Sequence, residues 1–249
     1  RAKILANFGV GFNHIDIAAA KARQLVVTNT PDVLTDDTAD DAIMLMLMVA
    51  RRAGEGERHV RARAWTGWRP THMVGTKVSG KTLGLVGMGR IARAVARRAR
   101  LGFGMRVTFH DPYPPPPEVV AELGIEPRGA MDDVVREADF VSLHCPATPD
   151  TRHLMDARRL ALMKPAAFLI NTARGDVVDE AALVAALKAG TIAGAALDVY
   201  EREPVVSPEL LAMENVVLLP HLGSATRETR LAMGVRTLEN LRAFFSGAA

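Results

Sequence analysis

The segment TLGLVGMGRIARA, residues 82–94, decides the fold class of this 249-residue chain. Its first half reads as a buried strand, and its second half, rich in alanine and arginine, reads as a helix. Gly87 permits a tight turn between them, Gly89 lets a ligand approach the backbone, and Ala92 stands where a third glycine is often replaced. A strand, this turn and a helix together predict a binding site for the pyrophosphate of a dinucleotide.

Strand-like and helical patterns alternate along the chain after this turn. The strand-like segments are TLGLVG (82–87), RVTFH (106–110), DFVSLH (139–144), AFLIN (167–171), GAALDV (194–199) and VVLLP (216–220). Helical patterns lie between them, for example RIARAVARRAR at 90–100 and DEAALVAALKAG at 179–190. We therefore predict an α/β fold with a doubly wound, six-stranded parallel (Rossmann) sheet covered by helices on both faces.

The second strand of this sheet ends at a carboxylate that can choose the cofactor. Asp111 follows RVTFH, at the position where an acidic side chain accepts hydrogen bonds from the adenosine ribose. The same charge would repel a 2′-phosphate, and Pro112 and Tyr113 follow instead of an arginine. Arg90, beside the glycine turn, could offset part of this repulsion. We therefore expect NAD as the cofactor and NADP as the less favoured one.

We divide the chain into three segments. Residues 80–223 form the NAD-binding domain, and residues 1–79 are interpreted as part of a smaller, flavodoxin-like substrate-binding domain with a linker. Residues 224–249 are expected to return to the smaller domain as a carboxyl-terminal helix. Because the chain opens at Arg1 and runs directly into the strand-like KILANF, we expect the amino-terminal part of the smaller domain to be missing.

The composition of the chain limits the kinds of partner and the cellular location that we expect for the protein. The longest apolar run, residues 42–50, is far shorter than the roughly 20 residues of a membrane-spanning helix. The single cysteine, Cys145, excludes an internal disulfide framework and favours the cytoplasm. A net charge of +3, aromatic residues at only 5% and a basic stretch at 51–65 that two glutamates interrupt argue against nucleic acid. The histidines show no metal-ligand spacing, so we expect no metal.

Reactive side chains follow three of the later strands. Arg174 comes after AFLIN, Asp198 after GAAL and His221 after VVLLP, and parallel strands present their carboxyl ends at one ligand-binding edge. The Arg174 guanidinium can hold a planar carboxylate through two hydrogen bonds, and His221 can donate a proton as hydride arrives. Glu203 would favour the protonated imidazole if it contacts the other ring nitrogen. Asp198 is expected at the nicotinamide end of the cofactor.

Four motifs together resemble the D-isomer-specific 2-hydroxyacid dehydrogenase family, and most closely its glyoxylate and hydroxypyruvate reductases. They are VGMGRIA (86–92), INTARGDVVDEAAL (170–183), GAALDVYEREP (194–204) and LLPHLGSAT (218–226). The resemblance implies an oxidoreductase that transfers hydride between NAD(H) and a small 2-oxo or 2-hydroxy acid and acts as a homodimer. It also implies that the arginine of TARG, the glutamate before proline and the histidine after proline are catalytic, which are Arg174, Glu203 and His221.

The resemblance extends to binding residues. Backbone N–H groups of Val10 and Gly11 are expected to bind the substrate carboxylate together with Arg174, and Ser224 is expected beside the substrate. The expected cofactor contacts are Thr38, Gly87, Gly89, Arg90, Ile91, Asp111, Cys145, Pro146, Thr151, Thr172, Ala173, Asp198, His221 and Gly223.

Three alternatives stay open in the sequence. Some members of this superfamily are NAD-sensing corepressors that keep the same catalytic residues, so a binding protein without significant turnover is the alternative to an enzyme. His144 also ends a strand and is a second, weaker candidate for the proton donor. Trp65 and Trp68 are either core residues or residues that reach a partner subunit.

Overall fold

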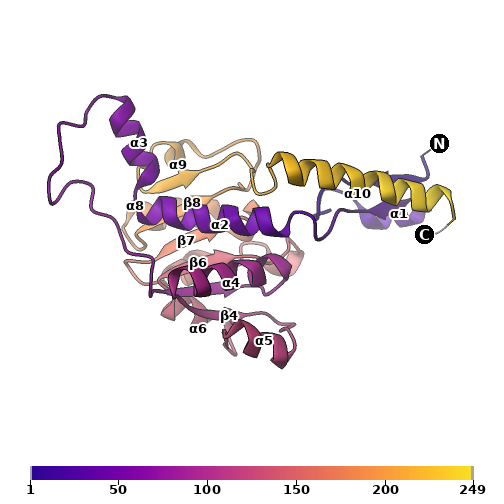
Figure 1. Ribbon diagram of the computed structural model, residues 1–249, viewed down its shortest axis with the longest axis horizontal. Coiled ribbons are helices and arrows are strands. Elements are labelled where there is room, and N and C mark those ends of the chain that lie inside the picture. Colours follow the sequence, from indigo (N-terminus) through magenta and orange to yellow (C-terminus); the bar gives the residue numbers. More distant parts are fainter. Residues whose placement is uncertain (1, 248–249) are drawn as a thin grey trace.

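The computed structural model describes residues 2–247 of the chain (Figure 1). Residue 1 and residues 248–249, the outer ends of the first and third segments predicted from the sequence, lie outside the described residues. Most of the chain forms one large parallel sheet with helices on both faces, and a smaller sheet lies at one end of the molecule (Figure 1). No helix among residues 2–247 is long and apolar enough to cross a membrane.

The large sheet has seven parallel strands in the order β5-β4-β3-β6-β7-β8-β9. The strands are β3 (Thr82–Val86), β4 (Arg106–His110), β5 (Glu126–Pro127), β6 (Phe140–Leu143), β7 (Phe168–Asn171), β8 (Gly194–Leu197) and β9 (Val216–Leu218). The predicted doubly wound sheet is confirmed, but the predicted number of six strands was wrong because β5 was missed. Two residues ending in proline give no alternating pattern, and Pro127 is tolerated because β5 pairs only with β4 at the sheet edge.

Helices cover the sheet on two apolar faces. Leu45 of α2 (Thr35–Ala50) and Val95 of α4 (Arg90–Phe103) pack with Leu85 on one face, and Leu183 of α8 (Glu180–Lys188) packs with Val86 on the other. Successive residues of a strand point to opposite faces, so each strand supplies both cores. The remaining elements on this sheet are α5 (Pro117–Leu123), α6 (Met131–Glu137), α7 (Ala157–Leu160), α9 (Pro208–Leu211) and the short 3-10 turns η1 (Pro149–Thr151) and η2 (Gly175–Val177).

The smaller sheet pairs the first two strands and lies beside the last helix. Strand β1 (Ile4–Ala6) runs parallel to β2 (Val26–Thr28), with α1 (Ile17–Ala22) between them in sequence. Helix α10 (Arg227–Phe245) packs on β1, and the Asn240 side chain donates a hydrogen bond to the carbonyl of Asn29 at 2.9 Å. The two termini therefore lie at the same end of the molecule (Figure 1).

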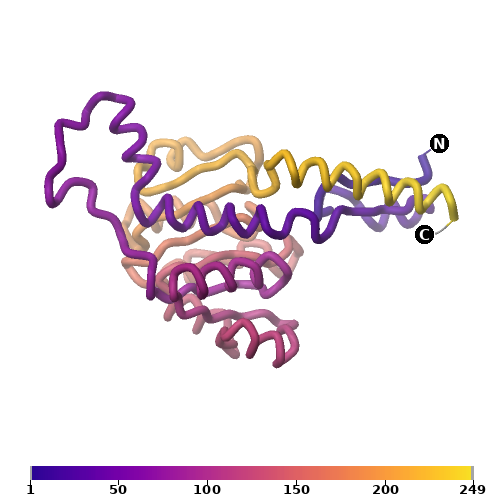
Figure 2. The backbone as a smooth tube through the Cα atoms, in the orientation of Figure 1, coloured from indigo at the N-terminus to yellow at the C-terminus, as the bar shows by residue number. Residues whose placement is uncertain are grey.

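A long connection leads from α2 to the large sheet. Helix α3 (Ala53–Arg61) and the irregular segment 62–79 extend away from the sheet as an arm (Figure 2). On this arm Trp65 is 55% exposed and Trp68 is 80% exposed. The alternative that these tryptophans are core residues was therefore wrong.

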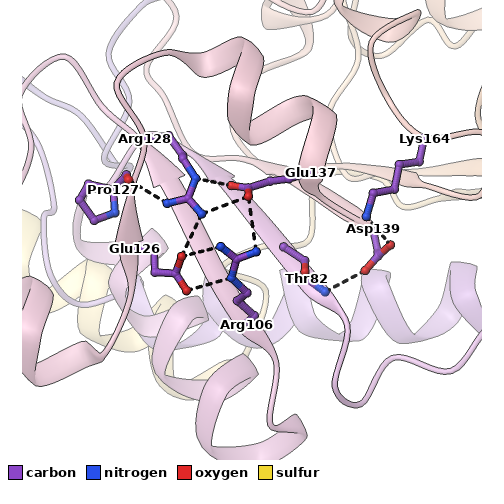
Figure 3. A network of polar contacts seen from close by, with 8 residues as sticks. All are labelled: Thr82, Arg106, Glu126, Pro127, Arg128, Glu137, Asp139 and Lys164. Carbon is purple, nitrogen blue, oxygen red and sulfur yellow. Dashed lines mark hydrogen bonds and ion pairs between the residues drawn. The ribbon is translucent and has the colours of Figure 1, made fainter.

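Charged side chains join the strands at the edge of the sheet where β3 and β4 begin (Figure 3). Arg106 pairs with Glu126 at 2.6 Å, and Arg128 pairs with Glu137 at 2.6 Å. The Arg106 guanidinium, together with Arg128, lowers the pKa of Glu126 to about 2. Arg106 and Glu126 are about half exposed and Arg128 and Glu137 are partly exposed, so water screens both pairs and they add little to the stability of the fold. The reactive groups lie at the opposite edge, where the strands end.

Candidate active site

The glycine turn after β3 has the shape that a pyrophosphate requires. Gly87 has φ +89°, and a Cβ there would lie 2.9 Å from the carbonyl of His144. A Cβ on Gly89 would meet nothing within 4 Å, so this glycine keeps space open rather than filling the core. Helix α4 begins at Arg90 with no side chain capping it, which leaves N–H groups of its first turn directed at that space. These residues fit the phosphates of a dinucleotide.

Asp111 lies beside this turn. Its Oδ2 accepts a hydrogen bond from the backbone N–H of Met88 at 2.6 Å, and its Oδ1 accepts one from Tyr113 at 2.7 Å. Each carboxylate oxygen keeps a second lone pair, so the fixed side chain can still accept from ribose hydroxyls. Arg90 points elsewhere: its Nε lies 2.7 Å from Asp32, in the segment after β2, and both side chains are largely exposed.

A buried asparagine places Arg174. Asn171, at the end of β7, donates to the carbonyl of Arg174 at 2.9 Å and accepts from the N–H of Ala173 at 3.0 Å. The guanidinium then reaches the loop between β1 and α1, where its Nε donates to Oδ1 of Asn13 at 3.0 Å. A Cβ on Gly11 would lie 1.7 Å from the second guanidinium nitrogen. Arg174 and Gly11, far apart in sequence, are therefore neighbours.

The loop that contains Gly11 presents backbone donors. Asn29 donates to the carbonyl of Val10 at 2.9 Å, and Asn7 donates to the carbonyl of Gly11 at 3.0 Å. Among residues 2–247, no hydrogen bond engages the N–H groups of Val10 and Gly11. Two free N–H groups beside a guanidinium form a site for a carboxylate.

His221 and Glu203 form the expected pair. Nδ1 of His221 lies 2.9 Å from Oε2 of Glu203, while Oε1 of Glu203 accepts from the N–H of Tyr200 at 3.1 Å. The imidazole is half exposed, and its Nε2 is left free for another partner. A carboxylate on Nδ1 holds the ring in one orientation.

Asp198 supports the turn that carries His221. Its Oδ1 accepts from the N–H of Leu222 at 2.6 Å and its Oδ2 from the N–H of Gly223 at 2.9 Å. The buried Thr38 hydroxyl of α2 donates a hydrogen bond to the carbonyl of Gly223 at 2.9 Å. Thr38 therefore also holds the turn that carries His221. Thr38 and Asp198 were expected as cofactor contacts, and the structure shows both already engaged in protein hydrogen bonds.

The other predicted residues lie along the same edge. Cys145 is half-buried, and burial raises its pKa to about 11, so the thiol is uncharged at neutral pH. Thr151 donates to the carbonyl of Pro146 at 2.6 Å, and the buried Thr172 hydroxyl has no partner among the described residues. Half-buried positions are held by Ile91, Ala173 and Ser224.

His144 does not fit a proton donor. Burial lowers its pKa to about 4, and its Nε2 lies 2.9 Å from the Ser142 hydroxyl. The ring is therefore neutral near pH 7, and its Nε2 is already engaged by the Ser142 hydroxyl. Within residues 2–247, no three His, Cys, Asp or Glu side chains gather as a metal site would require.

Sequence reasoning missed four polar residues of this region. Asn7, Asn13 and Asn29 hold the smaller-sheet loop and Arg174, and Asp41 of α2 is buried against Asp198. Of these four residues, only Asp41 could have been singled out from the sequence, because a carboxylate on the apolar face of a helix is unusual. The asparagines look like ordinary loop residues until the fold places them.

Comparison with known proteins agrees with this site. The sequence model of the NAD-binding domain of the D-isomer-specific 2-hydroxyacid dehydrogenases matches residues 43–223. Glyoxylate reductases of Thermococcus kodakarensis and Pyrococcus furiosus are 49% and 47% identical to this chain, over 99% of it and 74% of their own length. The crystal structure of an NADPH-dependent glyoxylate/hydroxypyruvate reductase from Sinorhizobium meliloti, in complex with NADP and malonate, matches with a TM-score of 0.91.

That structure is 42% identical and is covered over 75% of its chain by 98% of this one. Identity at this level over nearly the whole chain, with the glycine turn and the His221–Glu203 pair in place, shows the family. The chain therefore belongs to the D-isomer-specific 2-hydroxyacid dehydrogenases and is an NAD(P)-dependent oxidoreductase.

Proposed function

We propose that this protein reduces glyoxylate, hydroxypyruvate or a similarly small 2-oxo acid to the D-2-hydroxy acid. The observation that carries the proposal is the convergence of Arg174, the Gly11 loop and the His221–Glu203 pair. Arg174 and the Gly11 loop together can bind a carboxylate, and the His221–Glu203 pair can deliver a proton. Relatives that are named glyoxylate reductases support the choice of substrate.

Each residue has a distinct task in this reaction. When bound, the reduced nicotinamide supplies hydride to the carbonyl carbon. Arg174 and the N–H groups of Val10 and Gly11 hold the substrate carboxylate, and the guanidinium polarises the neighbouring carbonyl. His221 donates its Nε2 proton to the carbonyl oxygen and takes it back in the reverse direction. Glu203 keeps Nδ1 protonated and the ring oriented, which positions the donor.

Turnover tests the proposal. NADH oxidation should be measured spectrophotometrically with glyoxylate, hydroxypyruvate and pyruvate. We expect turnover with at least one of them. Tight NADH binding without oxidation by any 2-oxo acid would contradict the proposal and favour an NAD-sensing role.

Glu203→Gln should lower kcat for reduction. Glutamine keeps a hydrogen-bond acceptor for Nδ1 of His221 but removes the negative charge beside the imidazole that gives up the proton. We expect a fall smaller than the roughly 10²- to 10⁴-fold loss expected for the proton donor itself, while binding of NADH changes little. A kcat equal to that of the parent would mean that Glu203 does not position His221.

We further propose a preference for NADH that depends on Asp111. At an effective dielectric near 20, unit charges about 4 Å apart repel by about 4 kcal/mol, and screening still leaves roughly 10- to 10³-fold discrimination. Asp111→Ala should remove most of this difference in kcat/KM between NADH and NADPH. If the parent prefers NADPH, or if the variant keeps the same ratio of kcat/KM for NADH and NADPH, Asp111 does not distinguish the ribose hydroxyl from the 2′-phosphate.

Finally, we propose that the protein is a homodimer, with Trp65 and Trp68 of the arm at the interface. Exposed tryptophans on one extended segment are typical of an interface. Sedimentation equilibrium tests this.

The division of the chain at residues 79 and 223 is likewise our proposal. Helix α2 of the first segment packs on β7 and β8 of the second segment. The cytoplasmic location stays a prediction.

A further inference from the structure

Two buried carboxyl groups lie against each other beneath the turn that carries His221. Asp41, in the middle of α2, is 7% exposed, and Asp198, directly after β8, is 1% exposed. They are neighbours, because α2 packs on β8, and the Thr38 hydroxyl, one turn before Asp41, bonds to the carbonyl of Gly223, whose N–H bonds to Asp198. Two buried carboxylates beside each other repel, which favours a proton on one of them.

The hydrogen bonds of the pair show which group holds the proton. Asp198 accepts two backbone N–H bonds, from Leu222 and Gly223, which stabilise its charged form. No described donor reaches the buried Oδ2 of Asp41. Burial, and then repulsion by Asp198, raise the pKa of Asp41 to about 7. Asp41 is therefore the protonated partner below neutral pH, and it loses its proton in the neutral range.

Few other charges face this pair. Thr38, one turn before Asp41, is neutral and engaged by Gly223, and β7 ends in the neutral Asn171. His221, after β9, faces Asp198. On the two helices packed on α2, Arg98 of α4 pairs with Asp36 and Asp40, and Glu55 of α3 pairs with Arg52.

The pair lies close to where the chemistry takes place. The carbonyl of Asp198 accepts a hydrogen bond from the N–H of His221 at 2.9 Å. The proton and the hydride are delivered to two bonded atoms, so the nicotinamide ring has to lie within several ångströms of His221. The charge of the pair therefore acts on that ring through a mostly buried region, in which electrostatic interactions are weakly screened.

We propose that the buried Asp41–Asp198 pair sets the relative affinity of this enzyme for NAD+ and NADH, and that Asp41 makes this balance depend on pH. The inference rests on the proposed place of His221 in the reaction. With Asp41 protonated the pair carries one negative charge, and with Asp41 ionised it carries two. The oxidised nicotinamide ring is positively charged and the reduced ring is neutral, so the second charge stabilises only the NAD+ complex.

The sign of the effect follows from linkage. Ionisation of Asp41 favours NAD+, so bound NAD+ in turn promotes loss of the Asp41 proton. The ratio Kd(NADH)/Kd(NAD+) should therefore rise with pH through the neutral range. His221 would contribute a rise of the same sign, because a protonated imidazole repels the positively charged ring. The test has to remove that contribution.

Calorimetric titration in a His221→Gln background isolates Asp41. Both nucleotides are titrated between about pH 5.5 and 8.5, in two buffers with different ionisation enthalpies. We expect the Kd ratio to rise about 3- to 10-fold, as for unit charges several ångströms apart under partial screening, with proton release on NAD+ binding near neutral pH. Adding Asp41→Asn, which keeps a donor for Asp198 but cannot ionise, should flatten the ratio and abolish that release.

Asp40→Asn is the matched control. Asp40 is the neighbouring residue, carries the same charge and pairs with Arg98 on the surface, so its removal should leave the pH dependence intact. An equal rise in the Asp41→Asn variant, or no rise in the His221→Gln parent, overturns the inference while the dehydrogenase assignment stands. If neither nucleotide binds the unmodified protein, the cofactor assignment fails and the inference fails with it.

A further measurement needs no change at Asp41. In the His221→Gln protein, infrared spectroscopy should show a protonated carboxyl band at low pH that disappears as the pH rises through neutrality, and earlier in the NAD+ complex than in the NADH complex. This remains decisive if Asp41→Asn does not fold. The proposal is overturned if the band is absent, or if it disappears at the same pH in the NAD+ complex and in the NADH complex.

Discussion

His221→Gln should lower kcat for 2-oxo acid reduction by roughly 10²- to 10⁴-fold, as expected when a general acid is lost. Glutamine can occupy the space of the imidazole and still bond to Glu203, but it has no proton to give at the carbonyl oxygen. NADH affinity should change little because the glycine turn and α4 are untouched. Single-turnover measurement of NADH oxidation, with Kd for NADH determined separately, gives both quantities.

The chain offers a matched control for this variant. His153 resembles His221 in two ways. Both residues have a positive φ, and His153 also pairs with a glutamate, because its Nε2 lies 2.9 Å from Oε1 of Glu201. His153→Gln should therefore test the loss of such a pair without loss of the proton donor, and kcat should stay close to that of the parent. If both variants lost activity equally, the pairs would be structural and His221 would not be the donor.

The second large effect is expected at Arg174. Arg174→Lys keeps the positive charge but loses the planar fork that donates to Asn13 and that would bond to both oxygens of a substrate carboxylate. We expect kcat/KM for the 2-oxo acid to fall by about 30- to 150-fold, equivalent to about 2 to 3 kcal/mol of transition-state stabilisation. NADH binding should be almost unchanged, because the glycine turn and the start of α4 are untouched.

A comparison with Arg159→Lys separates this effect from general destabilisation. Arg159 is half-buried and donates to Asp132 and to the carbonyl of Leu154, so it loses the same kind of contacts on substitution. Its variant should lose some thermal stability but retain kcat/KM. Unaltered kcat/KM in Arg174→Lys would show that Arg174 does not hold the substrate carboxylate.

Much of the large sheet could be predicted from sequence because its signals are local. Apolar runs of strand length alternate with helical patterns, and the glycine turn marks the first crossover. These features located six of the seven strands close to their observed ends. Strand β5 could not be predicted, because its two residues become a strand only by pairing with β4.

The His221–Glu203 pair could be predicted for a similar reason. Both residues lie shortly after strand ends, and parallel strands place such residues at one edge. The surroundings of Arg174 could not be predicted, because Asn13 lies 161 residues away, in the loop between β1 and α1. The exposure of the tryptophans also depended on where the segment after α3 runs.

The fold class, the dinucleotide turn at Gly87 and the chemical identity of Arg174, Glu203 and His221 followed from local sequence patterns. The groups that surround them follow only from how the elements pack: Gly11 lies against the Arg174 guanidinium, and Asp41 lies against Asp198. Periodicity and turn residues act over a few positions and can be read along the chain. A contact between remote segments depends on how α2 and the smaller sheet pack around the large one, and no short pattern records that.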